Sequence, residues 1–179
     1  FALGFSASGR LAWLEQRAGA DARGVEWTVQ LIDLINDRAL PGKVLRAGGD
    51  VTAMCKAHAA EVSSLLADSD IQPVGDLALE QPAPGKDPTG VELRPGSKAG
   101  SIDVVLRAAA GEKKIGALTQ AGGGAAPAVL GLLRSPFEPR VAVAVSQAQA
   151  NARRGPTIHF FGGRLDKRWK PPAPPSSER

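Results

Sequence analysis

Residues 43–107 constrain the fold of this chain more than any other part of its 179 residues. A short apolar run at residues 43–46 is predicted to form a buried strand, and it leads through small residues at 47–50 into a pattern of helical period. Two segments of alternating apolar and polar residues follow, at 74–80 and 101–107, and such alternation is typical of strands. This order predicts a small domain of the α/β (α+β) class.

A helical period also precedes this stretch. Val25, Val29, Ile32 and Ile35 recur at the spacing of one helix face, and Pro41-Gly42 follows as a helix stop. The pattern predicts an amphipathic helix over residues 25–38. Further upstream two strands are plausible, at residues 1–5 and 11–14, and the second is preferred.

The helix of the central stretch has a clear start. Asp50 is a suitable N-terminal cap, because its carboxylate can accept from the first free backbone N–H groups. The expected inward stripe is small and consists of Val51, Met54, Cys55, Ala59, Val62 and Leu66.

The connection at residues 81–100 contains four prolines and four glycines. These residues interrupt helices and strands, so the sequence predicts a long irregular loop. Long loops in compact domains are usually functional or disordered.

After Gly111 the pattern starts again. Strands are predicted at 114–118, 140–145 and 157–161, and helices at 127–133 and 146–154. The two halves share the order strand, helix, strand, helix, strand, which suggests a degenerate tandem repeat. Residues 170–179 are rich in proline and predict an extended tail.

The βαβαββ order over residues 11–107 resembles the Alba superfamily, whose members bind DNA or RNA. The likeness is strongest at residues 46–54, Arg-Ala-Gly-Gly-Asp-Val-Thr-Ala-Met. In the second half, residues 114–134 and 145–151 resemble the stage V sporulation protein S branch of that superfamily. The resemblance implies an Alba-like module over 1–112, a degenerate second module over 113–165 and a basic tail over 166–179.

Charge is divided unevenly along the chain. The first 112 residues carry 11 basic and 15 acidic side chains, whereas residues 113–179 carry 11 basic and 3 acidic ones. Clustered cations gain free energy by neutralising phosphates and releasing counterions, so the second half favours a polyanionic partner. The alternative is a basic segment that lies against the protein's own acidic first half.

Two groups of residues are candidates for nucleic-acid binding. The resemblance implies that the loop between the last two strands reaches nucleic acid, and its cations are Lys86, Arg94 and Lys98. In the second half Trp169 is placed to stack on an unpaired base, which favours RNA over duplex DNA. The cations of that half are Arg153, Arg154, Arg164, Lys167, Arg168 and Lys170.

Catalysis has little support in the sequence. Cys55 and His58 can share a helix face, but two ligands do not define a zinc site, and Cys55 is expected to be a core thiol. Gly48-Gly49 and Gly122–Gly124 can receive a phosphate, yet tight turns are the expected role because no nucleotide-binding fingerprint is present. We therefore expect a non-catalytic protein with neither cofactor nor metal.

The expected partner is RNA, including ribosomal RNA. The chain is also expected to form a dimer with a second copy, or a pseudo-dimer of its own two halves, and no association with a membrane is expected. A second hypothesis is a structural subunit of a large ribonucleoprotein or organellar assembly such as a mitochondrial ribosome. The initial Phe1 fits a processed chain, and the single cysteine suits a reducing intracellular compartment.

Overall fold

The computed structural model describes residues 1–18, 25–46, 50–75, 77–83, 85, 88–119, 125–149, 155–166 and 169. These residues form three antiparallel sheets and one helix, a mixed α+β architecture that agrees with the predicted class at this coarse level.

Sheet A is the largest sheet and has the strand order β4-β3-β2-β1-β5. Sheet B has the order β11-β10-β9, and sheet C has the order β6-β7-β8. The strands of sheet A are β1 (Ala2–Phe5), β2 (Arg10–Ala18), β3 (Val25–Asp33), β4 (Arg38–Arg46) and β5 (Gln72–Pro73). The strands of sheet B are β9 (Ala128–Arg134), β10 (Arg140–Gln147) and β11 (Thr157–Arg164), and those of sheet C are β6 (Gly90–Pro95), β7 (Ser101–Ala108) and β8 (Gly111–Thr119).

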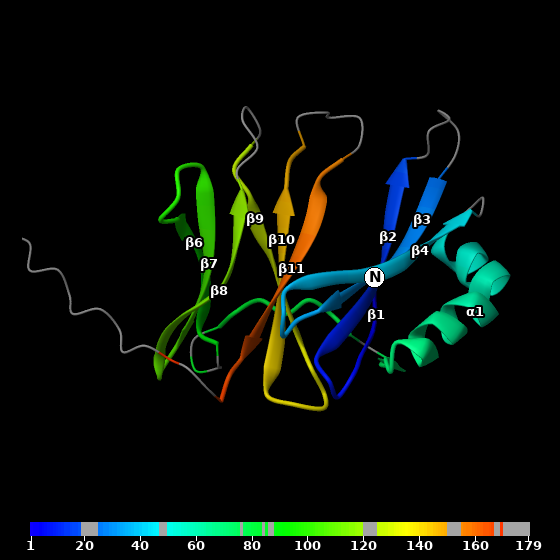
Figure 1. Ribbon diagram of the computed structural model, residues 1–179, viewed down its shortest axis with the longest axis horizontal. Coiled ribbons are helices and arrows are strands. Elements are labelled where there is room, and N and C mark those ends of the chain that lie inside the picture. Colours follow the sequence, from blue (N-terminus) through cyan, green and yellow to red (C-terminus); the bar gives the residue numbers. More distant parts are fainter. Residues whose placement is uncertain are drawn as a thin grey trace, which may run out of the picture.

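The elements are stacked in layers, in the order sheet C, sheet B, sheet A and helix α1 (Val51–Asp68) (Figure 1). Three clusters of buried apolar side chains fill the spaces between them. Sheet B therefore has packed side chains on both faces, and sheet A is covered by sheet B on one face and by α1 on the other.

Strand β2 shows how the sequence builds these layers. Successive side chains of a strand point to opposite faces, so alternate residues enter different clusters. Ala12 and Leu14 belong to the cluster beneath α1, whereas Leu11 belongs to the cluster between sheets A and B, with Trp13 packed against it.

Helix α1 begins where its sequence predicts. The Asp50 carboxylate accepts a hydrogen bond from the Ala53 N–H at 2.9 Å, and the backbone departs from helical geometry at His58. Met54 and Leu66 are its buried residues, whereas Cys55 and Ala59 of the predicted stripe are exposed. Among the described residues no helix is both long and apolar enough to cross a membrane.

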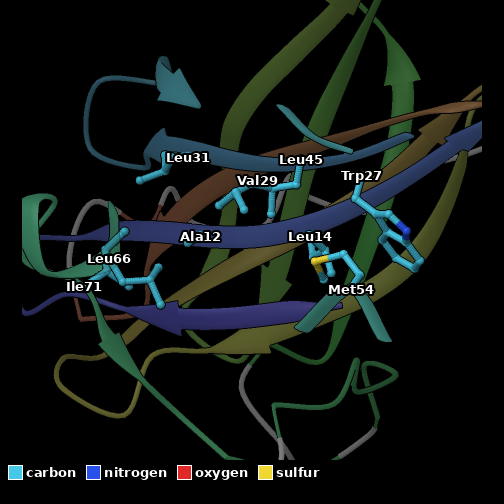
Figure 2. Close-up of a cluster of buried hydrophobic side chains, with 9 residues drawn as sticks. All are labelled: Ala12, Leu14, Trp27, Val29, Leu31, Leu45, Met54, Leu66 and Ile71. Atoms are coloured by element: carbon cyan, nitrogen blue, oxygen red, sulfur yellow. The ribbon is translucent and has the colours of Figure 1, made fainter. Parts of the chain in front are cut away.

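The cluster beneath α1 has two ends (Figure 2). Met54 of the helix lies beside Leu14, near Trp27 and Leu45, while Leu66 and Ile71 lie at the other end of the cluster near Ala12. The helix thus contacts sheet A through a few large side chains, and Val51, Val62 and Leu65 are the partly buried helix residues that pack beside them.

A close approach fastens sheet B to sheet A. A Cβ atom at Gly162 of β11 would overlap the carbonyl oxygen of Leu34. Beside it the buried Arg140 donates through Nε to Glu138 at 2.6 Å and through Nη1 to the Leu34 carbonyl oxygen at 3.3 Å. The turn after β3 is therefore held against β10 and β11 by a paired, nearly inaccessible cation.

Several predicted elements are confirmed. Helix α1 and the strands at 11–14, 43–46, 101–107, 114–118, 140–145 and 157–161 all lie within observed elements of the predicted type. The expected burial of the strand at 43–46 is wrong, because only Leu45 of its four residues is buried. Residues 2–5, the strand that was not preferred, also form a strand.

The predicted helix over 25–38 is wrong, because residues 25–33 form β3 and pair with both β2 and β4. The alternation of a strand is present here, because Trp27, Val29 and Leu31 are buried and the polar residues between them are half-buried. Val25, Val29 and Ile32 also fit the spacing of one helix face, so these apolar positions alone do not distinguish a helix from a strand. The predicted helix at 127–133 is wrong for a related reason: it is β9, which closes one edge of sheet B.

Other expectations are also corrected. The loop at 81–100 contains β6, and the strand predicted at 74–80 is reduced to a single bridge at Glu80. The βαβαββ order is not observed over the described part of residues 11–107, and the repeat order is not observed in the described residues. The predicted helix at 146–154 is wrong in its described part, because Ser146 and Gln147 belong to β10 and residues 148–149 are not helical. Residues 150–154 and the tail at 170–179 lie outside the described residues. The boundary expected after residue 112 stays a prediction, and residues 112 and 113 both lie in β8.

The contact at Gly162 yields a stability prediction. We expect Gly162→Ala to lower the free energy of unfolding by about 1–3 kcal/mol, because the new methyl group must displace the Leu34 carbonyl. Gly90→Ala is the matched control, since its added Cβ would meet only Arg107 side-chain atoms at 3.8 Å or more. Urea denaturation of both variants measures the difference, and equal stabilities would contradict this account of the contact.

Candidate functional site

A cavity of about 770 Å³ lies between sheets A and B. Side chains from β2, β9, β10 and β11, together with residues 77–79, surround it. Most of them are apolar: Trp13, Leu14, Leu77, Leu79, Leu130, Leu133, Ala144, Ile158 and Phe160. Its volume is within the range of about 300–1,000 Å³ that is typical of small-molecule sites.

Two aromatic rings form one wall. The ring centroids of Trp13 and Phe160 are 4.6 Å apart with an interplanar angle of 53°. Trp13 projects from sheet A and Phe160 from sheet B, so their contact bridges the two layers. Paired rings of this kind offer a large, rigid apolar surface to a ligand.

A second wall depends on a segment that crosses beside β9. Glu80 and Leu132 exchange backbone hydrogen bonds of 2.8 and 2.9 Å, and Gln81 Nε2 donates to the Leu130 carbonyl at 2.8 Å. Gly131 has φ +146°, a conformation that favours glycine, and a Cβ there would lie 2.8 Å from the Glu80 carbonyl oxygen. This close approach holds Leu77 and Leu79 beside the cavity.

Part of the rim of the cavity is apolar. Leu79 is 45% exposed and Leu130 is 37% exposed, and both are among the few large apolar side chains that face solvent. Exposed apolar groups gathered around a hollow are a feature of ligand-binding and protein-binding surfaces.

One part of the lining is polar. Glu15 accepts two hydrogen bonds from Arg17 Nη2, at 2.9 and 3.0 Å, and one from Gln30 Nε2 at 3.2 Å. The Glu15 side chain is only 10% exposed, whereas that of Arg17 is 39% exposed. Burial lowers the pKa of the nearby His159, and the negative charge of Glu15 opposes this shift.

In the part of the chain that the structure describes, no three His, Cys, Asp or Glu side chains are close enough together to hold a metal ion. His58 Nδ1 lies 3.3 Å from Glu61 and its Nε2 lies 3.3 Å from the Arg46 carbonyl oxygen. The expectation that Cys55 is a core thiol is wrong, since this side chain is exposed on α1.

Four of the residues predicted to bind nucleic acid are described, namely Arg94, Lys98, Arg164 and Trp169, and none of these four lines the cavity. Arg94 donates to Glu112 through two nitrogens at 2.7 Å and to Glu92 at 2.7 Å, and with Lys98 it lines a separate hollow of about 540 Å³ at the turn after β6. Arg164 pairs with Asp166 at 2.7 Å and with Glu138 at 3.3 Å.

Trp169 packs against the cluster between sheets B and C. Its Nε1 donates to the Leu165 carbonyl at 2.7 Å, and Lys113 Nζ lies 5.9 Å from the ring centroid. The remaining predicted residues lie outside the described residues: Lys86, Arg153, Arg154, Lys167, Arg168 and Lys170.

The cavity residues had no sequence signal as a site. The alternation of Leu77 and Leu79 was visible, but it predicts a strand, and the other lining residues are spread from β2 to β11.

Comparison with family models, curated proteins and solved structures found no match for the chain.

The ion pairs of Arg94 yield a pH prediction. Two arginines, Arg94 and Arg107, hold the pKa of Glu112 at about 2, below its ordinary value of 4.5. Because the folded-state pKa is lowered, Glu112 adds stability above pH 4.5 that is lost as the pH falls towards 2. We expect Glu112→Gln to be less stable than the parent at pH 7 and to lose less stability on acidification.

Chemical denaturation between pH 7 and pH 3 measures this difference. The double variant Arg94→Gln/Glu112→Gln completes a double-mutant cycle that isolates the pair. An unchanged acid dependence in Glu112→Gln would show that these bonds do not persist in solution.

Proposed function

We propose that this protein is a non-catalytic binding protein for an apolar small molecule that occupies the cavity between sheets A and B. The observation that carries the proposal is the cavity itself, about 770 Å³ in volume and lined mainly by aliphatic and aromatic side chains. Burial of apolar surface in such a space is favourable by roughly 25 cal/mol per Å².

The elements around the cavity support a small molecule as the occupant. Sites built on hydrogen-bonded strands hold their geometry better than sites on loops, and strands β2, β9, β10 and β11 supply most of this lining. The exposed Leu79 and Leu130 mark an entrance, while Trp13 and Phe160 form a fixed wall inside.

A cavity-filling variant tests this function. Ala144 lines the cavity, so Ala144→Phe places a ring where the ligand would lie without burying a charge. We expect decanol, the neutral probe, to bind the parent and to bind Ala144→Phe at least about tenfold more weakly, because the two compete for one space. Isothermal titration calorimetry and Trp13 fluorescence measure the binding.

Ala57→Phe is the matched control, because Ala57 is exposed on α1 and does not line the cavity. Unfolding midpoints show whether both variants remain folded. Equal decanol affinity in the parent and in a folded Ala144→Phe would refute the proposal, and so would the absence of decanol binding to the parent.

A second candidate is the nucleic-acid binding predicted from charge, with the related prediction of a subunit in a ribonucleoprotein assembly. Its support is the 11 basic against 3 acidic residues of positions 113–179, together with the resemblance to Alba proteins. The described Arg94 and Arg164 already pair with carboxylates, so this candidate rests on Lys98 and on the cations outside the described residues.

Salt dependence tests the second candidate. If Lys167, Arg168 and Lys170 contact RNA phosphates, replacing all three with Gln should weaken binding and flatten the slope of log affinity against log salt by about 2. Replacing Lys43, Lys56 and Lys114 with Gln is a control of equal charge. Indistinguishable slopes in the two triple variants would argue against contacts by the tail.

A further inference from the structure

Among the residues that the structure describes, four arginines form ion pairs with a carboxylate two residues away. The pairs are Glu15–Arg17, Glu92–Arg94, Glu138–Arg140 and Arg164–Asp166. Residues i and i+2 of an extended chain lie on the same side, which explains why the pattern recurs.

Arg17 differs from the other three. Arg94 reaches a second carboxylate at Glu112, Arg164 reaches Glu138, and Arg140 reaches the Leu34 carbonyl. Arg17 uses only Nη2, and among the described residues neither its Nε nor its Nη1 has an acceptor within hydrogen-bonding distance. Its guanidinium therefore retains donors at the edge of an apolar cavity.

The neighbouring Glu15 carboxylate is less available to a cationic ligand than Arg17 is to an anionic one. Glu15 is 10% exposed and already accepts from Arg17 and Gln30. A cationic ligand would have to displace these donors, whereas an anionic group can meet the unused edge of Arg17 directly. Guanidinium donors also match the geometry of carboxylate and phosphate oxygens.

We propose that the cavity binds a single-chain amphiphile with an anionic head, whose chain lies along Trp13, Leu133 and Phe160 and whose head is held by Arg17. This inference rests on the proposed function, because it names the ligand class of the same cavity. The mainly apolar lining suits the chain, and the half-exposed Arg17 at the rim lets the head remain in contact with water.

The experiment compares probes that share one chain. Decanoate, decyl phosphate, decanol and decyltrimethylammonium are titrated into the protein at pH 8, where the carboxylate is ionised. We expect one or both anions to bind about tenfold more tightly than decanol, and the cation to bind no more tightly than decanol. The ratio between decanoate and decyl phosphate distinguishes a carboxylate ligand from a phosphate ligand.

Variants identify the residue responsible. Arg17→Gln should weaken binding of the preferred anion about tenfold and leave decanol unchanged. Glu15→Gln should strengthen anion binding, because it removes the competing charge and releases Arg17 Nη2. Arg94→Gln is the matched control: it removes the same charge from a side chain that is 37% exposed on sheet C, and it should leave anion affinity within about twofold.

The outcomes separate this inference from the function on which it rests. If decanol binds but neither anion binds more tightly, or if a folded Arg17→Gln and Arg94→Gln behave alike, the anionic class is refuted while the apolar site stands. If Arg17→Gln does not fold, weaker or unchanged anion binding by Glu15→Gln refutes it instead. If no probe binds, both proposals fail.

Discussion

The architecture depends on the burial of both faces of strand β10. Val141, Val143 and Val145 pack towards sheet C, while Ala142 and Ala144 pack towards sheet A. The strand pairs with β9 on one side and β11 on the other, so its backbone groups are hydrogen-bonded within the protein rather than by water. Valine side chains cover one face of β10 and alanine methyl groups cover the other. Sheet B is therefore an interior layer whose two faces carry side chains of different size along this strand.

That difference explains where the cavity lies. On the alanine face, sheets A and B approach closely at Gly162, where a hydrogen atom replaces a side chain opposite the Leu34 carbonyl. Towards the other end of β11, Ile158 and Phe160 lie opposite Trp13, and the cavity lies beside these residues and Ala144. The cavity therefore results from pairing small residues with large ones along two sheets that are fastened at one end.

The sequence predicts those elements whose local signals agree with their surroundings. Asp50 and the pattern after it identify α1, and the alternation at residues 101–107 identifies β7. Strand β3 is mistaken for a helix because Val25, Val29 and Ile32 also fit a helical spacing, although buried apolar and half-buried polar residues alternate along the strand. The cavity is missed because Trp13, Leu79, Ala144 and Phe160 meet only after the sheets pack. Such a site has no local sequence motif, because its residues come together only through the pairing register of the strands and the stacking of sheets A and B.

The charge pattern has a related limit. Along the sequence, residues 113–179 show a large basic excess, yet folding pairs Arg140 with Glu138 and Arg164 with Glu138 and Asp166. A carboxylate on the same side of the chain two residues away neutralises an arginine locally, so a count of cations overstates the field that a partner meets. What matters for recognition is the number of hydrogen-bond donors that remain after such pairing. In the described residues Arg17 retains unused donors beside an apolar cavity. The distribution of unused donors therefore points to a ligand-binding region more directly than the distribution of charge does.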